Sequence, residues 1–281
     1  MSWMSFKKHI ISKLVWKKKQ WLTIVEQLLH PYAYKPERYA NTFLAKTSDS
    51  DDASITKPVP RVVYVFWTGD NEMSENRKRC LSIINSKIGV EVRLITPRNL
   101  KDYVLPNYPL HPAYEYLSYV HRSDYLRCYF MNYYGGGYGD VKSISHSWIS
   151  MFDRLDASDA YIIGYSERKF DDAAWYGEQD ENLRNDMYTY WRVLLGNGGY
   201  ICRPHTKFTE EWYEEICRRL DAHIEELKQH PSQEDPYANE GTDYPIKWTE
   251  ICGSVFHPLC LKYSERVLRN DKLRPSGKNY R

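Results

Sequence analysis

Residues 61–67 read Arg-Val-Val-Tyr-Val-Phe-Trp, and this run decides the fold class. It is almost continuously apolar and rich in β-branched and aromatic residues, which is typical of a parallel strand buried on both faces. Turn residues follow at 68–70, and the pattern then predicts a helix near 74–86, a second strand over 90–95 and another helix that starts at Thr96-Pro97. Strands that alternate with helices predict an α/β fold with a parallel sheet covered by helices. Because such sheets bind ligands beyond the carboxyl ends of their strands, the turn after the first strand is a candidate site.

Length and composition exclude several classes of protein. The 281 residues are enough for one large domain, or a domain with an appendage, that needs no disulfide or metal to fold. No run approaches the roughly 20 consecutive apolar residues of a membrane-spanning helix. The formal net charge of +2 gives no overall field that would attract nucleic acid, so we expect no nucleic-acid partner. The six cysteines form no Cys-x-x-Cys pair, and we expect buried, reduced thiols in a cytoplasmic protein.

The small net charge hides a strongly basic N-terminus. Residues 1–30 contain six lysines and one acidic residue, a net +5, which leaves −3 for the rest of the chain. Apolar residues recur here at steps of three and four, which predicts an amphipathic helix. Two interpretations stay open: the helix anchors the protein to an anionic membrane surface, or its apolar stripe docks on the protein's own core. A polar, proline-interrupted stretch follows, so we expect a basic helix and linker over residues 1–57 and one domain over 58–281.

The segment from His121 to Ser143 carries the most information about chemistry. A helix over 112–133 would place Asp124 and Arg127 three residues apart on one face. The glycine run at 135–137 is expected to stop this helix and to let the backbone approach a ligand closely. A short strand after it would present Asp140 and Lys142 on the same side, because side chains alternate along a strand. Two charged pairs at two breaks in conformation suit the hydroxyls of a sugar and the oxygens of a phosphate.

These residues resemble a family of retaining sugar transferases, the capsular polysaccharide synthesis and family-32 type. The likeness rests on Ser-Asp-x-x-Arg at 123–127, on the Tyr-Gly-Gly-x-Tyr-x-Asp pattern that ends at Asp140, on the sixteen residues from Asp124 to Asp140, and on Trp67-Thr68-Gly69. It is strongest over residues 60–145. The resemblance implies a GT-A fold, which is a Rossmann-like, mixed and mainly parallel sheet flanked by helices, here with an N-terminal amphipathic arm. It also implies transfer from a nucleotide-sugar donor.

The resemblance further implies roles for individual residues. Trp67 would stack on the nucleobase, and Asp124 and Arg127 would hold hydroxyls of the donor sugar, with Arg127 close to the diphosphate. Asp140 would contact the ribose or the sugar, or share a metal ion. The implied catalytic residues are Asp124, Arg127, Asp140 and Lys142. The implied nucleotide-sugar-binding residues are Phe66, Trp67, Thr68, Gly69, Asp124, Arg127, Gly136, Gly137, Tyr138, Asp140, Asn197 and His257.

The chain departs from the family pattern at Lys142, which stands where the second aspartate of Asp-x-Asp would be. That aspartate normally helps to hold a divalent cation, Mn²⁺ or Mg²⁺, against the diphosphate. An ammonium group does not ligate a metal, but it neutralises phosphate as a point charge. Three interpretations stay open: Lys142 replaces the cation, Asp140 still holds a metal with another group such as His257, or the protein binds without turnover.

Two other residues have both a functional and a structural interpretation, and two longer stretches have one each. Asn197, which precedes a Gly-Gly pair and a strand, would supply an amide or backbone donors near the acceptor, or only a turn. His257 is expected at a strand end, either as a phosphate or metal contact or as a satisfied core histidine. The charged stretch 165–186 is typical of a loop or lid over the acceptor side, whereas 206–229 predicts an amphipathic packing helix.

Together these features predict a glycosyltransferase that acts in capsular polysaccharide or lipopolysaccharide biosynthesis. We expect a UDP-sugar as the donor, a saccharide or glycolipid as the acceptor, and retention at the anomeric carbon. The basic helix at residues 1–30 would hold the enzyme peripherally at the cytoplasmic face of the membrane. The alternative is a GT-A-fold protein that binds sugar nucleotides or regulates without catalysis, and Lys142 is the residue that motivates it.

Overall fold

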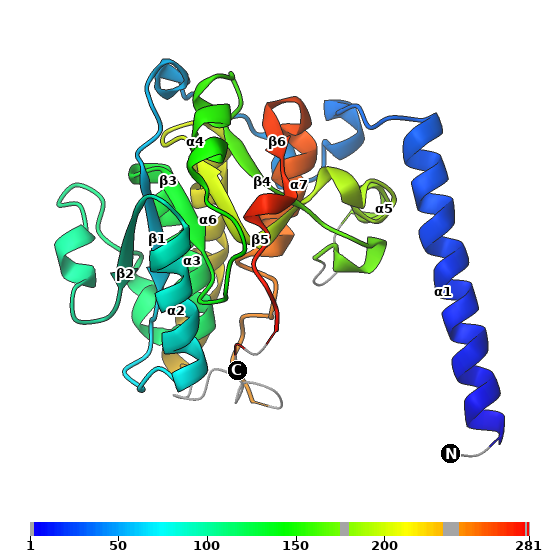
Figure 1. Cartoon of the computed structure of the whole chain (residues 1–281), viewed down its shortest axis with the longest axis horizontal. Coiled ribbons are helices and arrows are strands. Elements are labelled where there is room, and N and C mark those ends of the chain that lie inside the picture. Colours follow the sequence, from blue (N-terminus) through cyan, green and yellow to red (C-terminus); the bar gives the residue numbers. More distant parts are fainter. Residues whose placement is uncertain (1–2, 175–179, 233–241, 279, 281) are drawn as a thin grey trace.

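The computed structural model describes residues 3–174, 180–232, 242–278 and 280. The side chains of residues 3–8 are not described. Figure 1 shows a central sheet with helices on both faces and one long helix along the side of the body. The helices are α1 (Trp3–Leu29), α2 (Glu75–Lys87), α3 (Tyr119–Tyr133), α4 (Ile149–Asp156), α5 (Glu181–Thr189), α6 (Lys207–Gln229) and α7 (Gly253–Lys262). The strands are β1 (Val62–Phe66), β2 (Glu91–Ile95), β3 (Gly136–Gly139), β4 (Ile162–Ser166), β5 (Leu195–Cys202) and β6 (Val267–Arg269).

The described strands form one six-stranded sheet in the order β2-β1-β3-β5-β4-β6. β1 pairs in parallel with β2 and β3, and β4 pairs in parallel with β6, whereas β5 runs antiparallel to both of its neighbours. The sheet is therefore mixed and mainly parallel, which confirms the predicted Rossmann-like α/β fold class.

Strand β1 is buried along its whole length, as its sequence predicts. Val63 and Val65 pack on the side of the sheet that α2 and α4 cover. Tyr64 and Phe66 pack on the other side, with Phe130 of α3 edge-on to both rings. Apolar residues at every position are thus required, because both faces of this strand are covered by helices.

The glycine run after α3 is itself a strand, which corrects one prediction. The predicted helix over 112–133 divides into a 3₁₀ turn, η5 (Pro112–Tyr116), and α3. Gly136 has a φ of +85°, and a Cβ there would lie 2.7 Å from the carbonyl oxygen of Val62, the first residue of β1. Only glycine allows this approach, so β3 forms from the glycines, and Asp140 and Lys142 follow it in a turn instead of lying on a strand.

The helix predicted from Thr96-Pro97 is also wrong. The structure has only the 3₁₀ turn η4 (Leu100–Tyr103) there. The side chain of Asn99 accepts a hydrogen bond from the backbone nitrogen of Thr96 and donates one to the carbonyl oxygen of Leu94. These local bonds satisfy the backbone at the end of β2 and compete with a regular helix.

Helix α1 forms as predicted, but its apolar stripe does not pack on the body. The face that packs is polar: Trp16 donates to Asp171, Gln20 bonds the backbone of Arg168 and Phe170, and Thr23 accepts from Trp191. Figure 1 shows α1 beside α5 at the edge of the molecule. The opposite face exposes large apolar side chains, namely Ile10, Ile11, Leu14, Val15, Trp21, Leu22, Leu28 and Leu29.

Three further features of the described chain bear on the predictions. All six cysteines are free thiols and five of them are buried, as predicted. None of the described helices has the length and apolar character to cross a membrane. The stretch 165–186 contains the end of β4, a 3₁₀ turn (Phe170–Asp172) and the start of α5, while its residues 175–179 lie outside the described chain.

We predict that Gly136→Ala destabilises the protein by about 2 kcal/mol or more, because a residue with a Cβ is strained at positive φ and meets the Val62 carbonyl. The matched control is Gly277→Ala, since no atom lies within 4 Å of a Cβ built at that position. Denaturant unfolding of both variants measures the difference. Equal free energies of unfolding for the two variants would contradict the role assigned to β3.

Candidate functional site

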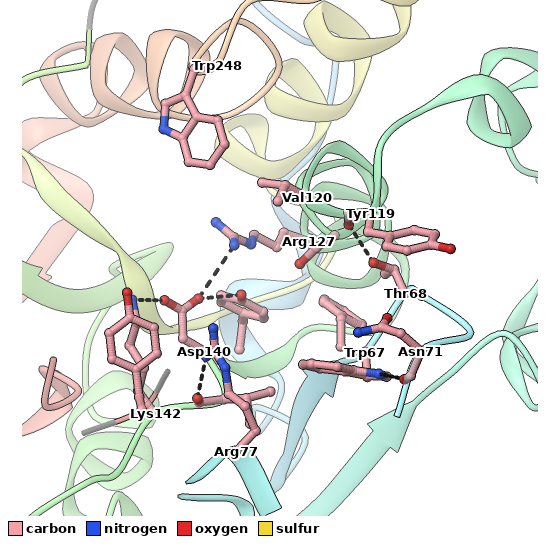
Figure 2. A pocket seen from close by; sticks show the side chains of 16 residues that line it. Trp67, Thr68, Asn71, Arg77, Tyr119, Val120, Arg127, Asp140, Lys142 and Trp248 are labelled. Atoms are coloured by element: carbon pink, nitrogen blue, oxygen red, sulfur yellow. Dashed lines mark hydrogen bonds and ion pairs between the residues drawn. The ribbon is translucent and has the colours of Figure 1, made fainter. Parts of the chain in front are cut away.

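The main candidate site is a cavity of about 380 Å³ at the carboxyl ends of β1 and β3. β1 and the turn after it supply one wall, and the first half of α3 supplies another (Figure 2). The turn after β3 supplies the charged floor, and three residues come from distant parts of the chain. The lining residues are Phe66, Trp67, Thr68, Gly69, Asn71, Arg77, Tyr119, Val120, Ser123, Arg127, Tyr138, Asp140, Val141, Lys142, Trp248 and Tyr280.

Asp140 is the centre of the charged network in this cavity. Its Oδ2 accepts from Nζ of Lys142 at 2.6 Å, and its Oδ1 accepts from the hydroxyl of Tyr138 at 2.6 Å. Nη2 of Arg127 lies 3.5 Å from the same Oδ1 (Figure 2). Burial opposes ionisation of this carboxyl, but Lys142 and Arg127 outweigh burial and hold its pKa below the ordinary value. Asp140 is therefore a fixed carboxylate between two cations.

Arg127 is positioned by contacts on every side. Its Nη1 lies 3.2 Å from Oδ1 of Asp124 and 3.3 Å from the carbonyl oxygen of Asn197. Its guanidinium carbon lies 4.6 Å from the ring centre of Tyr138. Because α3 carries Asp124 one turn before Arg127, the two charges pair within the helix, as the spacing predicts. Burial raises the pKa of Asp124 although the charge of Arg127 lowers it.

The cavity carries a surplus of positive charge. Arg77 reaches it from α2 and donates to the carbonyl oxygen of Val141 at 2.7 Å. The ring of Tyr280 lies over two of the cations, 4.5 Å from the guanidinium of Arg77 and 5.0 Å from Nζ of Lys142. Arg77, Arg127 and Lys142 thus face a single lining carboxylate, Asp140, with Asp124 behind Arg127. Such a surplus suits an anion with several charged oxygens.

An aromatic ring lies at the other end of the cavity. The indole nitrogen of Trp67 donates to the carbonyl oxygen of Asn71 at 2.8 Å, which fixes the orientation of the ring (Figure 2). The hydroxyl of Thr68 donates to the carbonyl oxygen of Tyr119 and joins the end of β1 to the start of α3. Trp67 is half-buried, so part of its ring faces the cavity.

The structure brings most of the predicted site residues together. Eight of them line the cavity: Phe66, Trp67, Thr68, Gly69, Arg127, Tyr138, Asp140 and Lys142. Asp124 lies behind Arg127, and Gly136 and Gly137 lie in β3. Asn197 faces Arg127 through its carbonyl oxygen and belongs to β5, not to a turn before it.

Sequence reasoning missed six polar or aromatic lining residues: Asn71, Arg77, Tyr119, Ser123, Trp248 and Tyr280. Ser123 and Tyr119 stand within or just before the Ser-Asp-x-x-Arg motif, so the period of α3 could have indicated them. Arg77, Trp248 and Tyr280 carry no local signal, because only the packing of distant segments brings them to the cavity.

The donor set does not favour a divalent cation. The described residues contain no group of three or more His, Cys, Asp and Glu side chains arranged to hold a metal. Asp140 is the acidic residue that lines the cavity, and both of its oxygens already bond to Lys142 and Tyr138. A dication at Asp140 would have to displace the ammonium of Lys142 and would be repelled by Arg127. The residues present therefore fit a site in which side-chain cations neutralise the ligand.

Comparison with known families identifies the family of the chain. Residues 14–176, more than half of the chain, match the model of the capsular polysaccharide synthesis protein family. The chain belongs to this family. The matched region includes Trp67, the Asp124–Arg127 pair, and Asp140 with Lys142, whereas the lining residues Trp248 and Tyr280 lie outside it. A search among curated proteins found no match.

His257 lies elsewhere, which corrects its predicted place at a strand end. It is fully buried inside α7, and its Nδ1 accepts from the backbone nitrogen of Ala174 at 2.9 Å. Its Nε2 faces Oε1 of Glu167 at 3.7 Å. Burial lowers the pKa of His257 to about 4, and burial together with Asp172 raises the pKa of Glu167 to about 7. His257 is thus neutral near pH 7, and Glu167 is mostly protonated only below about pH 7.

We predict that removing one member of this pair changes the pH dependence of stability in opposite directions. Folded Glu167 keeps a proton up to about pH 7, so its contribution falls as pH rises above the ordinary value. Folded His257 lacks a proton that the unfolded chain binds below about pH 6.5, so its contribution falls as pH drops.

When the pH rises from 5 to 7, the free energy of unfolding of Glu167→Gln should increase relative to that of the unmodified protein. That of His257→Asn should decrease relative to the unmodified protein, and each change should be about 1–3 kcal/mol. Urea unfolding at both pH values measures these changes. If the free energy of unfolding changed between pH 5 and pH 7 by the same amount in both variants and in the unmodified protein, the assigned protonation states would be wrong.

Proposed function

We propose that this capsular polysaccharide synthesis protein is a GT-A-type glycosyltransferase. It would transfer a sugar from a UDP-sugar to a saccharide or glycolipid acceptor during synthesis of a capsule or lipopolysaccharide. The observation that carries the proposal is the grouping of Arg77, Arg127 and Lys142 around Asp140, with Trp67 in the same cavity beyond the carboxyl end of β1. A nucleotide diphosphate sugar has an aromatic base and a dianionic linker, and this cavity complements both.

The proposed donor pose follows from the two ends of the cavity. The uracil stacks on Trp67, whose ring is fixed by its bond to Asn71. The diphosphate lies towards Arg77 and Lys142, and the sugar lies towards Asp140 and Arg127, whose charged groups suit sugar hydroxyls. Tyr280 lies against both cations and covers this end of the cavity.

The main catalytic contribution in this proposal is electrostatic. When the bond between the anomeric carbon and the diphosphate breaks, negative charge grows on the leaving oxygen. Lys142, Arg77 and Arg127 stabilise that charge, because they are already oriented by hydrogen bonds and partly shielded from water. Lys142 would thereby take the place of the divalent cation.

The same contacts bear on how the configuration would be retained. Among the described residues that line the cavity, Asp140 is the carboxylate, and Lys142 and Tyr138 occupy both of its oxygens. It is poorly placed to act as a nucleophile, so we favour displacement on one face of the sugar. The acceptor oxygen bonds to the anomeric carbon as the diphosphate leaves, and the acceptor proton passes to a diphosphate oxygen.

The test measures donor hydrolysis and transfer across common nucleotide sugars, with chelator and with manganese. We predict turnover in chelator, and a loss of about 100-fold in kcat for Lys142→Ala, the range seen when an oriented charge-stabilising group is removed. Lys101→Ala, an exposed lysine outside the cavity, is the matched control.

Unchanged turnover of Lys142→Ala in chelator would overturn the role of Lys142. Nucleotide binding without hydrolysis or transfer for any donor and acceptor pair would instead support a binding protein without catalysis.

We also propose that α1 holds the enzyme peripherally at the cytoplasmic face of the membrane. The helix binds the body through its polar face, so its large apolar side chains point away from the protein. Leu14 and Trp21, for example, are 61% and 62% exposed. Lysines on the same helix, such as Lys17 and Lys18, would contact anionic headgroups while the apolar face enters the interface.

The triple variant Leu14→Ser, Trp21→Ser, Leu28→Ser leaves the docked polar face intact. We predict that it binds phosphatidylcholine vesicles containing phosphatidylglycerol at least tenfold more weakly than the unmodified protein, as measured by co-sedimentation. The control, Tyr108→Ser with Ile149→Ser, removes exposed apolar side chains outside α1. Equal vesicle binding by the triple variant and the control would exclude α1 as the anchor.

A further inference from the structure

A second cavity, of about 690 Å³, lies between α1 and the body and is lined by four arginines. Ile24 of α1 lines it together with the end of β4, the 3₁₀ turn at 191–193 and the segment after β6. The arginines are Arg168, Arg192, Arg269 and Arg274, and the acidic lining residues are Glu167 and Asp271. We propose that this cavity binds the phosphate group of a lipid-linked acceptor, a proposal that rests on the glycosyltransferase function given above.

Two of the arginines are fixed by the backbone. Arg269 donates from Nε and Nη2 to the carbonyl oxygen of Val193, at 3.0 and 2.7 Å, and from Nη1 to that of Val267. Arg274 donates to the carbonyl oxygen of Ser166 and to Asp271. Neutral carbonyl groups hold Arg269 in place without cancelling its charge, so this guanidinium is oriented in advance for an anion.

The other two arginines are available to a ligand. Arg168 and Arg192 are exposed, and within the described chain their guanidinium groups make no hydrogen bond or ion pair. Their backbones, however, are tied to α1, through Gln20 at Arg168 and Gln27 at Arg192. Docking of α1 therefore fixes the backbone positions of Arg168 and Arg192. A free guanidinium pair beside a fixed one matches the oxygens of a phosphate group.

The two acidic residues cancel only part of this charge. Asp271 pairs with Arg274 at 3.0 Å. Burial raises the pKa of Glu167 to about 7, so much of this carboxyl is neutral near that pH. The lining therefore keeps a surplus of positive charge on Arg168, Arg192 and Arg269, which the proposed donor pose in the first cavity does not use.

The cavity adjoins both the reaction site and an apolar surface. The guanidinium of Arg274 lies 4.4 Å from the ring centre of Tyr165, whose hydroxyl accepts from the nitrogen of Gly198 at 3.1 Å. The carbonyl oxygen of Gly198 in turn accepts from the nitrogen of Asp140 at 3.0 Å. One tyrosine and one backbone residue therefore separate the arginines from the centre of the first cavity.

On the other side, a neighbouring cavity of about 450 Å³ shares Arg192 and Arg269 and continues along α1 to the exposed side chain of Leu28. A phosphate on the arginines would place an attached lipid chain along the apolar face of α1 and an attached sugar on the side of Tyr165. This order of groups, lipid then phosphate then sugar, is that of a lipid-linked saccharide.

The experiment measures binding of farnesyl diphosphate, a soluble short-chain probe, by the full chain in the presence of saturating UDP, which occupies the first cavity. We expect Arg168→Gln with Arg192→Gln to weaken this binding about tenfold or more. The matched control, Arg98→Gln with Lys101→Gln, removes two exposed cations that line neither cavity and should bind like the unmodified protein. Circular dichroism and UDP affinity check that the variants are folded.

Two further probes separate the sources of phosphate. Inorganic pyrophosphate should also bind less tightly to the Arg168, Arg192 variant, because it shares the charged group. If the Arg168, Arg192 variant lost binding only to phosphatidylglycerol vesicles and still bound farnesyl diphosphate normally, the acceptor assignment would be wrong. If the Arg98, Lys101 control variant lost as much binding to farnesyl diphosphate, the assignment of the site would be wrong. The glycosyltransferase proposal is tested by donor turnover and the arginine cavity by farnesyl diphosphate binding. The two proposals can therefore fail independently.

Discussion

The close approach of β3 to its neighbours is the constraint on which the rest of the structure depends. A Cβ at Gly137 would lie 2.8 Å from Cγ2 of Val63, and one at Gly199, opposite β3 on β5, would lie 2.5 Å from the carbonyl oxygen of Leu273. Trp148 fills the space beneath these glycines. Because the strand fits so tightly, the residue that follows it, Asp140, is delivered to the carboxyl end of β1, beside the turn that carries Trp67.

The electrostatics of the cavity follow from that placement. Once Asp140 is fixed, Lys142 two residues later returns to its Oδ2, and Arg127 from α3 approaches its Oδ1. A buried carboxylate between two cations stays ionised, and its main effect is to hold those cations in place. In the proposed function, Lys142 in the usual position of an aspartate would supply the positive charge that a metal ion would otherwise bring to the diphosphate.

The N-terminal helix reverses the usual arrangement of an amphipathic helix on a globular body. It docks through Trp16, Gln20 and Thr23 and exposes its apolar face. Because docking uses hydrogen bonds, the apolar side chains of α1 stay exposed and can be buried against another surface. The arginine cavity lies beneath this helix, so the proposed membrane contact, acceptor site and reaction site follow one another across the molecule, from α1 through Tyr165 to Asp140.

Local sequence pattern is enough to predict β1, the helices with a clear apolar period, and the pairing of Asp124 with Arg127. These features depend on residues that are neighbours along one strand or one helix turn, so local pattern is enough to predict them. The same holds for the turn that bears Trp67, because it ends the strand that the pattern identifies. Even the glycine run was recognised as a close approach, although its own role as a strand was not.

The other features depend on contacts between segments that are far apart in the sequence. Whether the glycines form a strand depends on distant partners: Gly137 pairs with Val63, 74 residues before it, and with Ile201, 64 residues after it. The face of α1 that docks depends on Asp171 and Trp191, and His257 became a core residue because α7 packs it against Ala174. Arg77, Trp248 and Tyr280 join the cavity from segments that carry no motif. In each case the deciding energy comes from contacts between distant segments, and local sequence does not encode which segments will meet.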